Sequence, residues 1–242
     1  MGTRDPVLEQ RIHEMVNHLH LGTPCYAYQE CDSTMDVARQ LADEGAPEGT
    51  LVFAARQTKG RGRMGRRWES PEGGAYFSLI LRPTRPPAEI PQLSLVGGLA
   101  VAETIYEQLK RASRPRRAPS RQGWSPTGVP DAAGDGAPAS VSPAVSIRWP
   151  NDVLVDGKKI AGILTEGSSA RDPRSTNHEP RSYVVLGIGI NVTTAPRDLP
   201  ETATSLLEAC GGVPQAEIPS EAVRPSRGKA ALTPSDPRST IH

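Results

Sequence analysis

Glycines and cationic side chains alternate in the segment from Gln57 to Trp68. The glycines let the backbone adopt positive φ and approach a ligand, while the cations supply positive charge, so the segment is suited to bind an anion. Its spacing matches neither the phosphate loop of nucleoside triphosphatases nor the dinucleotide-binding fingerprint. A solvated turn or an RNA contact of the Arg/Gly type are the alternatives, but the apolar strands expected on both sides favour a loop on a folded scaffold. The residues concerned are Lys59, Gly60, Arg61, Gly62, Arg63, Gly65, Arg66 and Arg67.

A second polar group falls inside an apolar stretch. The strand expected from residue 145 to residue 155 is broken at Pro150, where the turning backbone presents Asn151 and Asp152. An Asp-Gly turn at 156–157 then returns the chain, which places Lys159 at the head of the second arm of a hairpin. A surface kink would account for the proline but would not require a lysine opposite the two polar side chains.

Two more short motifs lie at the ends of expected elements. Ser33 and Thr34 begin a helix that would end near Gly45, and they suit either capping, with Asp32 or Asp36 assisting, or hydrogen bonding to a polar ligand. From these residues alone the capping interpretation is favoured. The strand from 183 to 191 is apolar on both faces and is therefore expected at the centre of a sheet. Its two glycines would admit a ligand or another backbone, and Asn191 ends it; the glycines are Gly187 and Gly189.

The remaining pattern supplies the elements that position these motifs. Helices are expected over 5–20, capped by Asp5, over 92–110, and, in a short form, over 201–209. Strands are expected near 26–29 and over 50–57, 75–81 and 159–166, with a polar loop over 167–181. The three histidines of the first helix are interpreted as surface residues rather than metal ligands, and the apolar side of the long helix is expected to hold Leu95, Leu99, Ala102, Ile105, Tyr106 and Leu109.

Composition limits the class of protein. The chain has 242 residues, enough for one main domain, and a net charge of +1, which argues against nucleic-acid binding through an overall field. It shows no apolar run near 18 residues and no signal-peptide pattern, so no membrane span is expected. Three cysteines without metal spacing predict reduced thiols in the cytoplasm. Residues 111–144, with a basic start, and 213–242 are too poor in apolar residues to form a core, and we expect a disordered insertion and a disordered tail.

Taken together, four motifs make the chain resemble biotin protein ligases of the monofunctional type without an amino-terminal DNA-binding domain. The resemblance covers about residues 26 to 211 and implies an α+β catalytic domain, a mixed β-sheet flanked by helices, over residues 1–212. It further implies a reaction in two steps. Biotin and ATP, with Mg²⁺, first give biotinyl-5′-AMP. The biotin is then transferred to a lysine of a biotin carboxyl carrier domain, which belongs to acetyl-CoA carboxylase or a related carboxylase. The motifs are Asp32-Ser-Thr, Gln57-x-x-Gly-Arg-Gly-Arg-x-Gly-Arg-x-Trp68, Trp149-Pro-Asn-Asp152 with Lys159-x-Ala-Gly-Ile-Leu-x-Glu166, and Gly187-x-Gly-x-Asn191.

The resemblance also implies roles for single residues. Arg63, Lys159 and Asp152 would be catalytic, and Asp152 would also lie on the magnesium side. The glycine-arginine loop would order on ligand binding and hold the reactive anhydride away from water. Biotin would be bound by Ser33, Thr34, Gln57, Arg61, Gly62, Arg63 and Lys159, and the nucleotide by Trp68, Asn151 and Asn191.

Two departures from the family pattern and several alternatives stay open. Met35 stands where relatives usually have an amide, which removes one polar contact, and residues 213–242 offer no counterpart to the small SH3-like carboxy-terminal domain, so a reduced activity is one expectation. The alternatives are a lipoate-type ligase and a non-catalytic biotin-binding relative. The resemblance predicts no DNA or membrane partner, and it leaves open the acceptor carboxylase, the oligomeric state and the role of the insertion.

Overall fold

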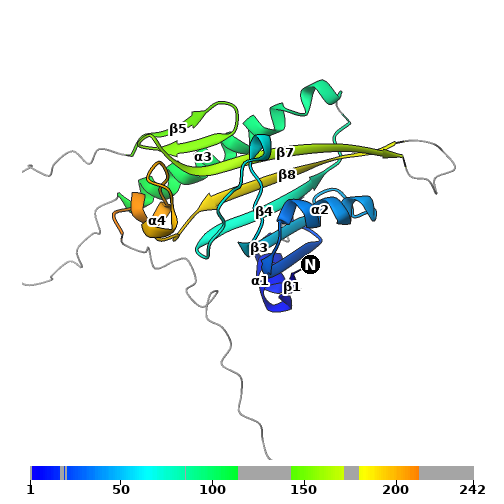
Figure 1. The fold of residues 1–242 in the computed structure, drawn as a ribbon, viewed down its shortest axis with the longest axis horizontal. Coiled ribbons are helices and arrows are strands. Elements are labelled where there is room, and N and C mark those ends of the chain that lie inside the picture. The colour runs from blue at the N-terminus through cyan, green and yellow to red at the C-terminus, as the bar shows by residue number, and fades with distance from the viewer. Residues whose placement is uncertain are drawn as a thin grey trace, which may run out of the picture.

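The computed structural model describes residues 2–16, 19, 21–84, 86–113, 143–171 and 180–212. They form one eight-stranded sheet with the order β1-β2-β3-β4-β8-β7-β6-β5, flanked by helices (Figure 1). The α+β architecture expected from the sequence is therefore confirmed. The elements are β1 (Thr3–Arg4), α1 (Pro6–Val16), β2 (Cys25–Cys31), α2 (Thr34–Asp43), β3 (Leu51–Gln57), η1 (Arg63–Gly65), β4 (Gly74–Leu81), η2 (Pro87–Glu89), α3 (Gln92–Ala112), β5 (Val145–Arg148), β6 (Asp152–Val155), β7 (Lys158–Arg171), β8 (Pro180–Asn191), η3 (Pro196–Asp198) and α4 (Leu206–Ala209).

The sheet is mixed because β2 and β3 run parallel while every other neighbouring pair is antiparallel. Strand β8 lies between β4 and β7, as its apolar pattern predicts. The prediction of a polar loop over 167–181 is wrong at both ends of that range. Strands β7 and β8 stay paired as far as Arg171 and Pro180, because the antiparallel ladder supplies partners for their backbone groups.

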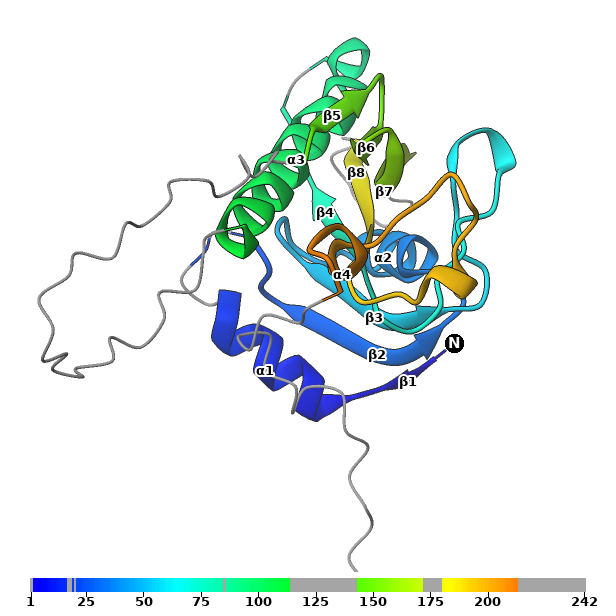
Figure 2. The same ribbon diagram turned by 90° about the vertical axis from the view of Figure 1, so that its left-hand side faces the viewer.

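The helices cover the two faces of the sheet differently. Helices α1 and α3 lie on one face and α2 on the other, inside the curve of the sheet (Figure 2). Along β8, Leu186 and Ile188 belong to the core beneath α3, whereas Val185 belongs to the core beneath α2. The alternation follows from the two-residue period of a strand, and it fixes which side chains can reach a site on the α2 face.

The buried side of α3 differs from the expected one. Leu95, Leu99 and Tyr106 were predicted to be buried, but they are 43%, 52% and 45% exposed. The helix instead brings Gly97 against the sheet, where a Cβ would lie 3.4 Å from Ile163. Glycine permits this close approach, so the helix presents a neighbouring stripe to the core: Ser94, Gly97, Gly98, Val101, Ala102, Ile105 and Leu109.

The ends of α1 and α2 test the predicted caps. The backbone N–H of Leu8 donates to Asp5 Oδ1 at 3.0 Å, so the cap of α1 is confirmed, although α1 ends at Val16 rather than at residue 20. The N-cap of α2 is Ser33, but its side chain makes no capping hydrogen bond. The capping box predicted with Asp36 is therefore wrong, and the Ser33 hydroxyl is left for another role.

The hairpin around Lys159 is also more complex than expected. Strand β5 pairs antiparallel with β6 around a cis Trp149–Pro150 bond, and β6 pairs with β7 around a second turn. The proline thus starts a hairpin of its own rather than kinking one strand. The second turn is the predicted one, with Asp156 and Gly157 both at positive φ.

Other expectations concern the termini and the cysteines. The short helix α4 is confirmed only over its last residues, Leu206–Ala209. The three cysteines are free thiols, and burial raises the pKa of Cys25 to about 11 and that of Cys31 to about 12. Most of the predicted insertion and all of the predicted tail fall outside the described residues. Among the residues described, none belongs to a helix long and apolar enough to cross a membrane.

Candidate active site

The predicted site residues meet on the α2 face of the sheet. The pocket, with a cavity volume of about 50 Å³, lies between the start of α2, the glycine-arginine loop and strands β7 and β8. All predicted biotin ligands line it, together with Trp68 and Asn151, whereas Asp152 and Asn191 do not. Its lining residues are Ser33, Thr34, Met35, Gln57, Arg61, Gly62, Arg63, Trp68, Asn151, Lys159, Gly162, Ile163, Leu164, Gly187, Ile188 and Gly189.

Glycines on the two central strands make room for the pocket. A Cβ at Gly187 would lie 2.7 Å from the sulfur of Met35, and a Cβ at Gly189 would lie 2.7 Å from Trp68 Nε1. On the adjacent strand, a Cβ at Gly162 would lie 2.9 Å from the Trp68 ring. Since these separations are shorter than a real Cβ contact, only glycine allows Met35 and Trp68 to lie directly on the sheet. The two glycines of β8 thus admit side chains where the sequence predicted a ligand or another backbone, and the approach of a ligand to them stays a prediction.

The glycine-arginine segment forms a narrow two-stranded ribbon. The backbone N–H of Trp68 donates to Gly60 O at 3.0 Å, and that of Gly62 donates to Arg66 O at 2.8 Å. The chain reverses at the tip, where Met64 and Gly65 have φ values of 56° and 73°. These hydrogen bonds give the glycine-rich segment a defined backbone conformation. Its cationic side chains therefore project from fixed positions.

The polar end of the pocket is built around Gln57. Its Oε1 accepts hydrogen bonds from the backbone N–H and the hydroxyl of Thr34, at 2.8 and 3.1 Å, and its Nε2 donates to Ser70 at 2.9 Å. The Thr34 hydroxyl also accepts a bond from Ser78. In contrast, Ser33 Oγ is buried and has no hydrogen-bond partner among the residues that the structure describes. Gln57 and Thr34 thus hold each other in place, while the Ser33 hydroxyl has full capacity to bind a ligand.

Lys159 connects the pocket to the neighbouring hairpin. Its Nζ lies 2.6 Å from Asp152 Oδ1 and 4.9 Å from the centre of the Trp68 ring. Arg148 binds the other carboxylate oxygen of Asp152 at 2.6 Å. Burial alone would raise the pKa of Asp152, but hydrogen bonds from Lys159 and Arg148 and their charges hold it below its usual range. Asp152 therefore stays ionised and fixes the lysine ammonium beside the indole.

The two asparagines predicted on the nucleotide side lie in different places. Asn151 lines the pocket, and its Nδ2 donates to Ile163 O at 3.0 Å. Asn191 is buried outside the lining, where its Nδ2 donates to Thr204 O at 3.0 Å and its Oδ1 has no partner among the described residues. The structure thus gives Asn191 a link between the end of β8 and the segment before α4, and its contact with a nucleotide stays a prediction.

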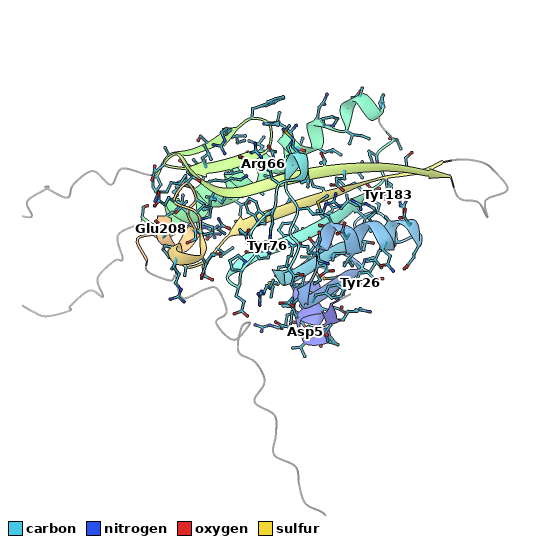
Figure 3. All side chains as sticks on the ribbon, in the orientation of Figure 1. Asp5, Tyr26, Arg66, Tyr76, Tyr183 and Glu208 are labelled. Carbon is cyan, nitrogen blue, oxygen red and sulfur yellow. The ribbon has the colours of Figure 1, made fainter. Side chains whose placement is uncertain are left out.

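The ribbon cations divide into two groups. Lys59 pairs with Asp32 at 3.1 Å, and Arg67 approaches Glu69 at 3.5 Å. Arg61 lies within 2.7 Å of two carboxylates. Over the part of the chain that the structure describes, Arg63 and Arg66 pair with no carboxylate, and Figure 3 labels Arg66 between Tyr183 and Glu208 along the long axis of the molecule. Arg63 and Arg66 therefore supply the uncompensated positive charge.

Several contributors were not predicted from the sequence. The apolar side chain of Leu164 had no assigned role, although its place two residues after Gly162, on the same face of the strand, would have indicated it. Ile163 and Ile188 also border the pocket, but their side chains pack in the core beneath α3. Arg39 was also missed; its position three residues after Asp36 on a helix was the available signal. The described residues contain no cluster of three acidic, histidine or cysteine side chains that could hold a metal.

Comparisons with known proteins agree with this geometry. The model of the biotin/lipoate A/B protein ligase family matches residues 26–191. The bifunctional ligase/repressor BirA of Bacillus subtilis is 41% identical over 184 residues, which cover 74% of this chain and 45% of that protein. The biotin--[acetyl-CoA-carboxylase] ligase of Mycobacterium tuberculosis is 30% identical over 186 residues, covering 74% of this chain and 53% of the relative. The chain thus spans about half the length of these relatives.

Solved structures give the same assignment. Biotin protein ligase from Aquifex aeolicus in complex with biotin and ATP has a TM-score of 0.51 and 33% identity, over 78% of this chain and 62% of that one. The Leishmania major enzyme in complex with biotinyl-5-AMP has a TM-score of 0.52 and 30% identity, over 78% and 65%. Since the family model spans more than half of the sequence, this chain belongs to the biotin/lipoate A/B protein ligase family.

Proposed function

We propose that the chain catalyses the ATP-dependent ligation of biotin, through biotinyl-5′-AMP, to a specific lysine of a biotin carboxyl carrier protein. One observation carries the proposal. Ser33 Oγ and Trp68 Nε1, in two residues that line the same pocket, are buried and have no hydrogen-bond partner among the described residues. Buried polar groups are rarely left unpaired, so a ligand with its own polar atoms accounts for both.

The chemistry of the pocket suits biotin. The hydroxyl of Ser33 and the groups around Gln57 offer hydrogen bonds to a ureido ring, and Met35 and Leu164 offer apolar surface to a hydrocarbon chain. Arg63 and Lys159 supply positive charge for a carboxylate. We propose that Ser33, Thr34, Gln57, Gly62, Arg63 and Lys159 bind biotin, with the part of Arg61 treated below.

In the first proposed step, a biotin carboxylate oxygen bonds to the α-phosphorus of ATP, and the bond from that phosphorus to pyrophosphate breaks. Two anions must approach, and negative charge spreads over the phosphate oxygens, so cations and backbone N–H groups lower the barrier. Arg63 is suited to this role because its charge is uncompensated by the described residues. Lys159, held by Asp152, supplies a second fixed charge.

In the second proposed step, the ε-amine of the carrier lysine attacks the carbonyl carbon of the anhydride. AMP leaves with the bonding electrons, and the nitrogen loses a proton as the amide forms. Neither step needs a nucleophile from this chain. Trp68 and Asn151 would contact the nucleotide, and Asn191 would do so only if the segment around Thr204 shifted.

Magnesium enters the proposal as part of the Mg·ATP substrate. Asp152 does not fit a metal ligand in the geometry described, because Lys159 and Arg148 each occupy one of its carboxylate oxygens. We therefore assign Asp152 the orientation of Lys159 rather than a bond to magnesium. A residue that orients a charge is expected to affect turnover more than folding.

The wider assignments rest on the same site. We propose that residues 1–212 form the catalytic domain, that its acceptor is a biotin carboxyl carrier domain of acetyl-CoA carboxylase or a related carboxylase, and that it acts in the cytoplasm. The relatives named biotin--[acetyl-CoA-carboxylase] ligase support the choice of acceptor. Free thiols with raised pKa values, which are poor nucleophiles, agree with a reducing compartment.

ATP–pyrophosphate exchange tests the proposal directly. Exchange in the presence of Mg·ATP should depend on biotin and not on lipoate, and Arg63→Ala or Lys159→Ala should lower it about a hundredfold or more. Lys158→Ala is the matched control, because this adjacent exposed lysine pairs with Glu208 away from the pocket. Transfer to a carrier domain would then establish the second step. Lipoate-dependent exchange would favour the lipoate-type ligase, and biotin binding without exchange would favour a non-catalytic relative.

A further inference from the structure

We infer that Asp36, Arg39 and Glu166 are positioning residues, which anchor the glycine-arginine ribbon by holding Arg61 in a closed ring of ion pairs. The inference rests on the proposed function only where ligand binding is concerned. Its core is a set of contacts between three segments that lie far apart in the sequence: helix α2, the ribbon and strand β7.

Each charged group in the ring contacts two groups of opposite charge. Arg61 Nη1 lies 2.7 Å from Asp36 Oδ1, and Arg61 Nη2 lies 2.6 Å from Glu166 Oε1. Arg39 Nη1 lies 3.3 Å from the same Asp36 oxygen, and Arg39 Nη2 binds Glu166 Oε2. Two guanidinium groups thus alternate with two carboxylates, and the ring carries no net formal charge.

The position of Arg61 on the ribbon gives the ring its effect. Arg61 lies on one arm, where it bridges to Arg67 on the other arm, and the chain reverses two residues further on, at Arg63–Gly65. Fixing Arg61 to α2 and β7 therefore fixes the arms and leaves only the tip beyond the anchor. The tip carries Arg63, whose place over the pocket then depends on the ring.

The ring also removes Arg61 from the set of free cations. A guanidinium that faces two carboxylates offers a ligand anion little net attraction, since the anion would meet the carboxylates as well. Arg63 and Arg66 have no such partners among the described residues. The geometry therefore assigns anchoring to Arg61, and the resemblance-based expectation that Arg61 binds the biotin carboxylate becomes the alternative outcome of the test.

Partial burial and geometry make this ring stronger than a typical surface pair. The side chains of Glu166 and Arg61 are 26% and 34% exposed, whereas isolated, fully exposed pairs contribute little. Each planar guanidinium directs one Nη to Asp36 and the other to Glu166, a fixed arrangement of two donors that lysine cannot reproduce. Loss of one carboxylate leaves two guanidinium groups that share the single remaining carboxylate, so one substitution should weaken the whole ring.

Trypsin offers a readout that needs neither substrate nor activity. The ribbon tip contains cleavage sites after Arg63 and Arg66, and peptides ending at these residues can be quantified by mass spectrometry during limited digestion of the full chain. Glu166→Gln and Asp36→Asn should each speed these cleavages about tenfold. Glu9→Gln is the matched control, since Arg4 binds Glu9 through two contacts of 2.7 Å on α1, away from the ribbon; it should change them less than twofold.

A double-variant comparison separates a ring from independent contacts. If Arg61 acts through Glu166, Arg61→Gln combined with Glu166→Gln should cleave no faster than the faster single variant. Multiplied effects, or cleavage of Glu166→Gln within twofold of Glu9→Gln, would overturn the inference. Because this assay contains no biotin, its result stands even if biotin-dependent exchange is not observed in the unsubstituted protein.

The kinetic consequence distinguishes positioning from mere stability. Glu166→Gln should raise the KM for biotin in the exchange assay about tenfold and lower kcat less than threefold, because ligand binding must then also order the ribbon. Glu166→Asp, which keeps the charge on a shorter side chain, should recover part of that change. An unchanged KM with a lower melting temperature would show a structural role only, and a large loss of kcat with unchanged trypsin cleavage would return Arg61 to direct ligand contact.

Discussion

The same strands form both faces of the sheet, but one face packs a core and the other forms the pocket. On the α3 face, side chains such as Ile163 and Leu186 fill the space between sheet and helix and leave no room for a ligand. On the α2 face, the adjacent positions Gly162 and Gly187 carry no side chain, which lets Trp68 and Met35 of the pocket lining lie directly on the sheet. Since neighbouring residues of one strand alternate between the faces, a single strand contributes both to stability and to binding.

This division sets how each face should respond to substitution. The α3 face is an apolar core, where a lost methyl group leaves a cavity. The α2 face holds polar atoms of Ser33 and Trp68 that have no partner in the described part of the chain, and they reduce stability unless a ligand satisfies them. Substitutions on the first face should therefore change the free energy of unfolding, and those on the second should change ligand affinity.

The largest effect on stability is expected for Leu109→Ala. Leu109, on the buried side of α3, is 2% exposed in the apolar core, so its truncation should lower the free energy of unfolding by about 2–5 kcal/mol. The dissociation constant for biotin, measured by calorimetry on the folded fraction, should stay within twofold. A loss of affinity as large as the loss of stability would mean that the two faces do not act separately.

The largest effect on binding within the comparison is expected for Gly189→Ala. The new Cβ would lie 2.7 Å from Trp68 Nε1, so the indole must move into the space of the pocket. Overpacking of about 1–3 kcal/mol corresponds to a biotin affinity that is weaker by roughly 5-fold to 150-fold.

Gly98→Ala is the matched control on the other face. A Cβ there would meet only Ile163, at an ordinary 3.8 Å, within helix α3. Because alanine favours a helix by about 1 kcal/mol over glycine, this variant should melt at a higher temperature and bind biotin normally. Equal biotin affinities for Gly98→Ala and Gly189→Ala would contradict the proposal that the glycines of the central strands shape the biotin pocket.

The sequence predicted the functional face better than the packing of the helices. The glycines of β8 and the polar residues of the four motifs could be recognised because their types are unusual inside apolar strands. The buried stripe of α3 was mispredicted because Leu95 and Leu99 fit a helical period as well as the true stripe does, and the close contact at Gly97 that selects between them is tertiary. Hydrophobic period alone cannot choose between two overlapping faces.

Hydrogen bonding and ion pairing were the least predictable features of the site. Ser33 has the type and position of a cap, yet Gln57, from a distant strand, binds Thr34 at the start of the helix instead. The ring around Arg61 joins residues separated by 105 positions, and nothing local in the sequence specifies that pairing. Such contacts depend on the register of the whole sheet.

A smaller effect on stability and biotin affinity is expected when the hydroxyl of either of two buried serines is removed. Ser33→Ala removes a hydroxyl with no partner among the residues described, so the free energy of unfolding should not fall. Biotin affinity should fall about three- to tenfold through one lost hydrogen bond. Ser78→Ala is the control, because its hydroxyl donates to Thr34 at 2.9 Å. That variant should lose about 1 kcal/mol of stability. If Ser33→Ala lost as much stability as Ser78→Ala, the Ser33 hydroxyl would have a protein partner after all.

The smallest effect lies at the edge of the pocket and depends on pH. The pKa of Asp152 is lowered in the folded chain, so between that value and the ordinary one, about 3.9, the unfolded chain binds more protons than the folded chain. The stabilisation is therefore fully present above about pH 4 and is lost as the pH falls through the folded value.

Asp152→Asn lacks this group, whereas the other carboxyls with lowered pKa values, Asp5 and Asp32, are common to both proteins and cancel in the difference. The difference in unfolding free energy between the two proteins, from urea titrations, should be constant from pH 7 to about pH 4 and should shrink below it. If the unsubstituted protein instead gained stability relative to Asp152→Asn as the pH fell from 7 to 5, the pKa of Asp152 would be raised in the folded chain, and Lys159 would not be its partner in solution.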